Sequence, residues 1–94
     1  MRHYILAKLR PEETDKAAVL NDVQAIFADA AAIPGIHAVS IRPNVIDRPN
    51  RYDLMIELTM DREALAAWDA SDIHHTWKDR YEARLEKKAI FDCD

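Results

Sequence analysis

The sequence predicts a small α+β domain of the ferredoxin-like type, in which helices cover one face of a four-stranded antiparallel sheet. Short segments of alternating apolar and polar residues occur four times. Longer segments with apolar residues at three- and four-residue spacing lie between them, and Pro, Gly or Asp marks the boundaries. The resulting order, strand–helix–strand–strand–helix–strand, is that of a split βαβ pair.

The first half of the chain supplies two strands and one helix. Residues 3–9 alternate and predict a strand, which Pro11 ends because proline cannot donate a ladder hydrogen bond. Thr14 is the expected N-cap of a helix that ends near Ile33-Pro34-Gly35. Its inward stripe is apolar: Val19, Val23, Ile26, Phe27 and Ala30. Residues 36–42 then form the second predicted strand.

The second half begins with a polar loop over residues 43–51 and a cleanly alternating strand over residues 52–60. Asp61 is the expected cap of a short helix over residues 62–69. Ser71 or Asp72 caps a longer helix that runs to about residue 86, and residues 88–93 close the sheet.

Composition limits the classes of function. The 94 residues suffice for a single domain, residues 1–94, and the net charge of −4 without a basic stripe argues against nucleic-acid binding. No apolar run reaches the length of a membrane helix. The one cysteine, Cys93, rules out an intrachain disulfide, so a cytoplasmic location is expected. Gly35 is the only glycine, which excludes glycine-rich phosphate loops.

Three polar residues fall on positions that should face the apolar interior: His3, His74 and Asp92. The first and last strands of this topology are antiparallel neighbours, so His3 should lie beside Asp92. His74 shares the inward stripe of its helix with Trp77, Tyr81 and Leu85, whereas His75 faces solvent.

Each of these residues has a functional and a structural interpretation. His74 is either a general base or a core histidine bonded to a backbone carbonyl. The pairing of His3 with Asp92 either fixes the imidazole tautomer or only links two strands. Two histidines and an aspartate also form a metal triad, but they come from three separate elements with no ligand motif, so we predict no metal and no cofactor.

The sheet face away from the helices carries apolar residues that nothing in one chain covers: Tyr4, Leu6, Ala38, Met55, Ala89 and Phe91. Such a patch usually marks an interface. We therefore predict a symmetric homodimer with the two sheets packed face to face.

The chain resembles the stress-responsive A/B barrel domain (Dabb) family over nearly its full length. The matching segments are the opening RHYILAKL, Ile33-Pro34-Gly35-Ile36, Tyr52-Asp53-Leu54, Glu63-Ala64-Leu65, His74 and the closing Ala89-Ile90-Phe91-Asp92. The resemblance implies a dimeric α+β barrel. It also implies roles, because a cofactor-free polyketide cyclase of that family uses a histidine base at the position of His74.

By the same resemblance, His3 and Asp92 match the first-strand histidine and last-strand aspartate of that cyclase. Trp68 stands where it has a tyrosine, and an indole donates a hydrogen bond but cannot act as an acid. Tyr81 is a candidate replacement for the phenol. Core and stripe residues are expected to line a pocket for a small apolar or carbonyl-bearing ligand: Ile5, Val23, Ile26, Phe27, Ile56, Trp68, Trp77, Tyr81 and Ile90.

The function predicted first is therefore a small-molecule binder or cofactor-independent cyclase or lyase with a histidine base. The alternatives are a non-catalytic structural stress protein and a cofactor-free monooxygenase of the same barrel type. The charges of Arg48 and Arg51 could also close over an anion, although solvated loop charges are commoner.

Overall fold

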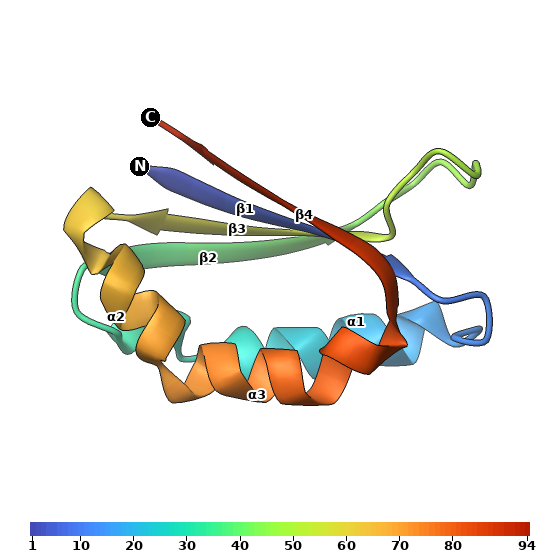
Figure 1. Ribbon diagram of the computed structural model, residues 1–94, viewed down its shortest axis with the longest axis horizontal. Helices are drawn as coiled ribbons and strands as arrows, with labels where there is room; N and C mark the ends of the chain where they lie inside the picture. The colour runs from blue at the N-terminus through green and yellow to red at the C-terminus, as the bar shows by residue number, and fades with distance from the viewer.

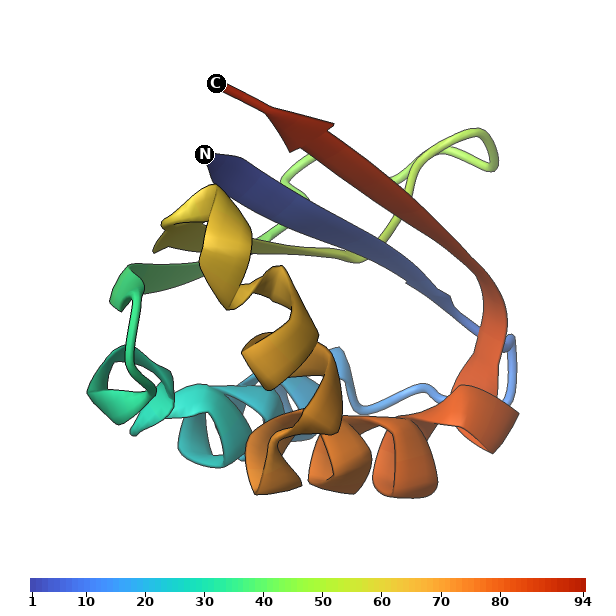
Figure 2. The ribbon, with the colours of Figure 1, turned by 60° about the vertical axis from the view of Figure 1, so that its left-hand side comes forward.

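A computed structural model describes all residues, 1–94. The strands are β1 (Arg2–Leu9), β2 (Ile36–Pro43), β3 (Leu54–Met60) and β4 (Leu85–Cys93). The helices are α1 (Lys16–Phe27), α2 (Leu65–Ala70) and α3 (Asp72–Tyr81), and short 3-10 turns cover Ala30–Ala32, Arg62–Ala64 and Glu82–Arg84. The sheet is antiparallel in the order β2-β3-β1-β4, with the helices on one side (Figures 1 and 2). The predicted fold class is confirmed.

The register places β1 between β3 and β4. His3 lies opposite Asp92, and Ile5 lies opposite Ile90, as the topology predicts. On its other side Ile5 pairs with Ile56 of β3. Lys88, Ile90 and Asp92 lie at alternate positions of β4, so their side chains share the face toward the helices.

The core fills the space between the sheet and the helices. Phe27 packs against Trp68 and Trp77 with ring centroids 5.6 and 5.8 Å apart. All three side chains are almost fully buried. These aromatic contacts tie α1, α2 and α3 together beneath the sheet.

The helix boundaries differ from the predicted ones. Asp15, not Thr14, caps α1, because its carboxylate accepts from the backbone N–H of Ala18 at 3.1 Å. The helix ends at Phe27, and a separate 3-10 turn continues toward Pro34. Asp61 caps nothing with its side chain and instead bonds His37, 2.9 Å away.

The chain also enters the last strand earlier than predicted. α3 ends at Tyr81, and β4 begins at Leu85 because a register shift at Lys8/Leu9 lets Leu85 pair with Leu9 and bury its side chain. β3 begins later than predicted, at Leu54.

Gly35 makes the tight connection into β2. Its φ is +86°, a conformation that side-chain-bearing residues rarely adopt. A Cβ at this position would lie 2.7 Å from the Cβ of Ala64. Both the backbone angle and the contact require glycine.

The opposite face of the sheet is open. Phe91 is 63% exposed there, and Tyr4, Leu6, Met55 and Ala89 are only partly buried. The loop between β2 and β3 rises on this side, away from the helices (Figure 1). It carries Val45, which is 87% exposed. Separately, none of the helices is long and apolar enough to cross a membrane.

Candidate functional site

A cavity of about 240 Å³ lies beneath β4, between the edge of the sheet and helices α2 and α3. His3, His74 and Asp92 all line it. The structure therefore brings together the three polar residues that the sequence pattern directs inward. They come from β1, α3 and β4, so only the folded topology assembles them.

The buried member of the group is His3. The residue is 5% exposed, and its Nδ1 lies 2.5 Å from Oδ1 of Asp92. The Asp92 side chain is 38% exposed, so this carboxylate reaches the interior from the open edge of the sheet. An ionised carboxylate only accepts hydrogen bonds, so Nδ1 of His3 carries the hydrogen.

His74 is oriented by the junction between α2 and α3. Ser71 caps α3 through an Oγ that accepts from the backbone N–H of His74 at 3.2 Å. The His74 ring donates from Nδ1 to the backbone carbonyl of Asp69 at 2.8 Å. Its other side lies near Trp68, with the ring centroids 5.2 Å apart.

The two imidazoles therefore have the same tautomer. A carbonyl oxygen and a carboxylate accept hydrogen bonds but do not donate them, so each Nδ1 keeps its hydrogen when the ring is neutral. The lone pair then resides on Nε2 in both rings, and neither Nε2 has a partner within the chain. This arrangement supplies two proton acceptors at one small cavity.

Only part of the predicted apolar lining reaches this cavity. Ile5, Trp77 and Ile90 do so. The remaining predicted residues lie elsewhere, in or against the core: Val23, Ile26, Phe27, Ile56, Trp68 and Tyr81. The reason is that these six residues pack in the space between the helices and the sheet, whereas this cavity lies under the edge strand β4.

Trp68 is completely buried, and its indole N–H has no hydrogen-bond partner. Tyr81 is equally buried, but its hydroxyl donates to Asp22 at 2.6 Å. Burial, followed by this bond to Asp22, raises the pKa of Tyr81 to about 12. Tyr81 therefore joins α3 to α1 and does not replace the cyclase tyrosine as an acid in the cavity.

Four lining residues were not predicted: Leu65, Asp69, Lys78 and Lys88. For two of them, Lys78 and Lys88, the spacing in the sequence indicates an inward position. Lys78 follows His74 by one helical turn, and Lys88 has the strand parity of Ile90 and Asp92. Long basic side chains usually extend into solvent, so their periodicity alone does not predict a site.

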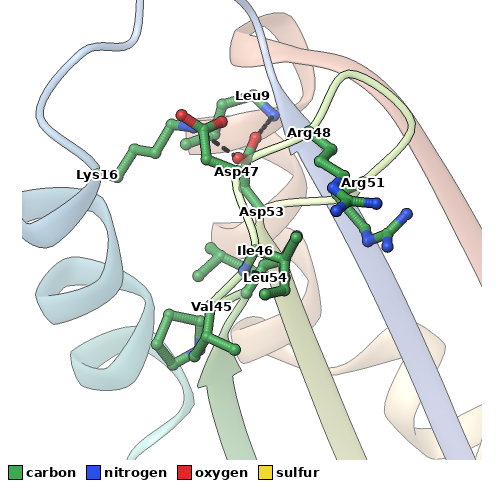
Figure 3. A pocket seen from close by; sticks show the side chains of 11 residues that line it. Leu9, Lys16, Val45, Ile46, Asp47, Arg48, Arg51, Asp53 and Leu54 are labelled. Carbon is green, nitrogen blue, oxygen red and sulfur yellow. Dashed lines mark hydrogen bonds and ion pairs between the residues drawn. The ribbon is translucent and has the colours of Figure 1, made fainter.

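A second hollow, of about 260 Å³, lies under the loop between β2 and β3 (Figure 3). Two of its charged residues, Lys16 and Asp53, are paired with each other. Asp53 accepts from the backbone N–H of Leu9 and from Nζ of Lys16, both at 2.8 Å. Arg48 and Arg51 extend on the side away from Lys16 (Figure 3). This cluster fastens the loop to β1 and α1.

No group of three or more His, Cys, Asp or Glu side chains has the geometry to hold a metal ion. Asp92 lies 2.5 Å from His3, so its near oxygen is engaged in that contact.

Comparisons of the whole chain with solved structures identify the fold. A dimeric ferredoxin-like protein of unknown function from Bacteroides fragilis superposes with a TM-score of 0.81 at 18% identity, over 99% of this chain and 93% of that one. A dabb family protein with a ferredoxin-like fold from Mesorhizobium loti gives 0.73 at 18% identity, over 99% and 93%. The hydroxynitrile lyase from Passiflora edulis gives 0.73 at 14% identity, over 96% and 87%.

No protein-family model and no curated protein matches the sequence. The resemblance to the Dabb family seen in the residues thus extends to the three-dimensional fold, which this chain shares with a dabb family protein.

Proposed function

We propose that this chain binds a small carbonyl compound in the cavity beneath β4 and acts on it by base catalysis without a cofactor. One observation carries the proposal. In both His3 and His74, Nδ1 is hydrogen-bonded within the protein, and Nε2 has no partner in the chain. The free lone pair on Nε2 of a neutral imidazole is a proton acceptor.

His74 is the proposed base. Its backbone and its Nδ1–H are both bonded at the helix junction, so the ring is held before substrate arrives. It would take a proton from the carbon next to a carbonyl group, leaving the electron pair on the resulting enolate. His3, held by Asp92, would accept a hydrogen bond from a substrate hydroxyl or relay the proton.

The fold neighbours are consistent with a reaction of this class. One of them is a hydroxynitrile lyase. Cleavage of a hydroxynitrile requires removal of a hydroxyl proton and departure of cyanide, so it uses a base and needs no redox step. A proton acceptor beside a small cavity suits removal of a proton from the carbon next to a carbonyl group, and equally removal of a proton from a hydroxyl group.

The test is deuterium exchange at carbons next to a ketone, followed by NMR in D₂O, together with aldehyde release from an aromatic hydroxynitrile. We expect measurable turnover in one of the two assays, lowered by about 100-fold or more in His74→Asn. The control is His75→Asn, which removes an exposed imidazole on the solvent side. Equal rates in wild type and His74→Asn, or no turnover in either assay, would contradict the proposal.

The proposed assembly is a homodimer formed through the open sheet face. Phe91 and its partly buried apolar neighbours form a patch there that a second copy would cover, and several fold neighbours are described as dimeric. Light scattering should give the mass of two chains. Phe91→Glu should shift the mass toward one chain, whereas Ala25→Glu on the exposed side of α1 should not. A monomeric wild type would rule out this assembly.

The proposed location is the cytoplasm. The only cysteine, Cys93, is unpaired and partly buried, which suits a reducing compartment.

A further inference from the structure

We infer that the substrate of this cavity is a small oxo acid, whose carboxylate is held by Lys78 and Lys88. The inference rests on the proposed function, because it names the substrate class for the same site. It starts from the unpaired charges of the molecule.

Most basic side chains already have a partner in the chain. Seven of them form ion pairs with carboxylates: Arg2, Lys8, Lys16, Arg42, Arg62, Arg80 and Arg84. Arg10 bonds a backbone carbonyl, Arg51 bonds Asn50, and Lys87 lies over the ring of Tyr52.

The cations that remain without a partner are Arg48, Lys78 and Lys88. Arg48 belongs to the exposed loop and lines the hollow beneath it as a single unpaired cation. The other two both line the cavity beneath β4. Two unpaired ammonium groups on the wall of one small cavity attract an anion.

The topology places both lysines at the same end of the cavity. α3 runs toward the start of β4, so late residues of the helix lie near early residues of the strand. Lys78 is one turn beyond His74, about 6 Å along the helix. Lys88 precedes Asp92 by four residues on the same face of β4, which is about 13 Å along the strand.

The acidic residues of the cavity, Asp69 and Asp92, lie toward its other end. Asp69 lies beside His74, to which its backbone carbonyl is bonded, and Asp92 lies beside His3. The cavity thus has a proton-accepting end and a cationic end. A ligand that matches both has a carbonyl group at one end and a negative charge about one helical turn away.

The size and chemistry of the cavity favour a carboxylate. A volume of about 240 Å³ is below the roughly 300–1,000 Å³ of most ligand pockets, which leaves little room for a coenzyme ester. The cationic end offers two flexible point charges, without an arginine fork or a glycine-rich loop that would surround a phosphate.

The experiment compares 4-oxopentanoate and 5-oxohexanoate with their methyl esters, which keep the ketone and lose the charge. Dissociation constants come from NMR titration, and deuterium exchange next to the ketone is followed in the same samples. The variants are Lys78→Gln with Lys88→Gln, and the control is Lys87→Gln, which removes the same charge from the neighbouring position on the other face of β4.

We expect the wild type to bind at least one of the acids more tightly than its ester, by about fivefold or more. The double variant should lose this preference, and Lys87→Gln should keep it. Equal affinity for acid and ester in the wild type, an unchanged preference in the double variant, or no binding of either acid would overturn the inference.

Failure of this inference is distinguishable from failure of the proposed function. His74→Asn could abolish exchange in the esters while the lysine variants leave the preference for acid over ester unchanged. That result would support His74 as the base and rule out the anion site. Alternatively, the lysine double variant could lose the preference for the acid while His74→Asn exchanges protons as fast as the wild type. That result would support the anion site and rule out His74 as the base.

Discussion

The hollow under the loop between β2 and β3 and the cavity under β4 have similar size and similar numbers of charged residues, but they differ in what those charges do. Under the loop between β2 and β3, Asp53 accepts from Leu9 and Lys16, so these two charges hold the chain to itself, and the unpaired Arg48 extends away from Lys16 (Figure 3). Under β4, both Nε2 atoms and both lysines have no partner in the protein.

The contrast shows that unpaired polar groups, not the number of charges, distinguish a binding site from a structural cluster. Polar atoms of a folded chain are usually satisfied by other atoms of that chain. A site that binds a ligand keeps some of them available. Changes in the two hollows should therefore have opposite effects on activity and stability.

After His74→Asn, the largest effect is expected from Asp92→Ala at the cavity. Removing the carboxylate frees Nδ1 of His3 and releases its tautomer, so exchange or cleavage should fall by about tenfold or more. Asp94→Ala, at the exposed chain end, serves as the control because it only breaks a surface pair with Arg62. Full activity of Asp92→Ala would remove His3 from the mechanism.

A smaller effect, of the opposite kind, is expected from Asp53→Ala under the loop. The substitution leaves the backbone N–H of buried Leu9 without its acceptor, so unfolding in urea should show a loss of about 1–3 kcal/mol. Turnover at the β4 cavity should stay unchanged below the new unfolding midpoint. Asp47→Ala, on the same loop, should cost little. A loss of activity without a loss of stability would mean that this hollow takes part in the function.

The smallest effect concerns Tyr81, which is part of the core. Its pKa is about 12 when folded, against 10.0 for the ordinary phenol. The protonated phenol therefore stabilises the fold fully below pH 10, and this contribution declines as the pH rises toward 12.

Urea unfolding at pH 9 and at about pH 11 should show a decline of about 1 kcal/mol in wild type that Tyr81→Phe lacks. Asp22 keeps its ion pair with Arg80 in that variant, so no charge is left unpaired. A wild-type decline that Tyr81→Phe reproduces in full would place the titrating group elsewhere.

The sequence was sufficient to predict the topology and the meeting of His3 with Asp92, because strand alternation and the split βαβ order together determine the register. It was not sufficient for the lining of the cavity. Phe27, Trp68 and Tyr81 have the same helical periodicity as lining residues, and only three-dimensional packing shows that they fill the core.

The place of Lys78 and Lys88 in the lining of the cavity could not be predicted for a related reason. A basic residue at an inward position is compatible with a side chain that extends to solvent. Only the three-dimensional structure shows that both residues line the same cavity and lack carboxylate partners. The tautomers of His3 and His74 likewise depend on contacts with Asp92 and the Asp69 carbonyl that no periodicity contains.

The measurement that tests the central claim most directly is ¹⁵N NMR of the histidine ring nitrogens in neutral rings, before and after addition of 5-oxohexanoate. We predict that His3 and His74 both carry their hydrogen on Nδ1, and that the Nε2 signals of both move when the oxo acid binds. A hydrogen on Nε2 of His74, or ring signals of both residues that ignore the ligand, would contradict it.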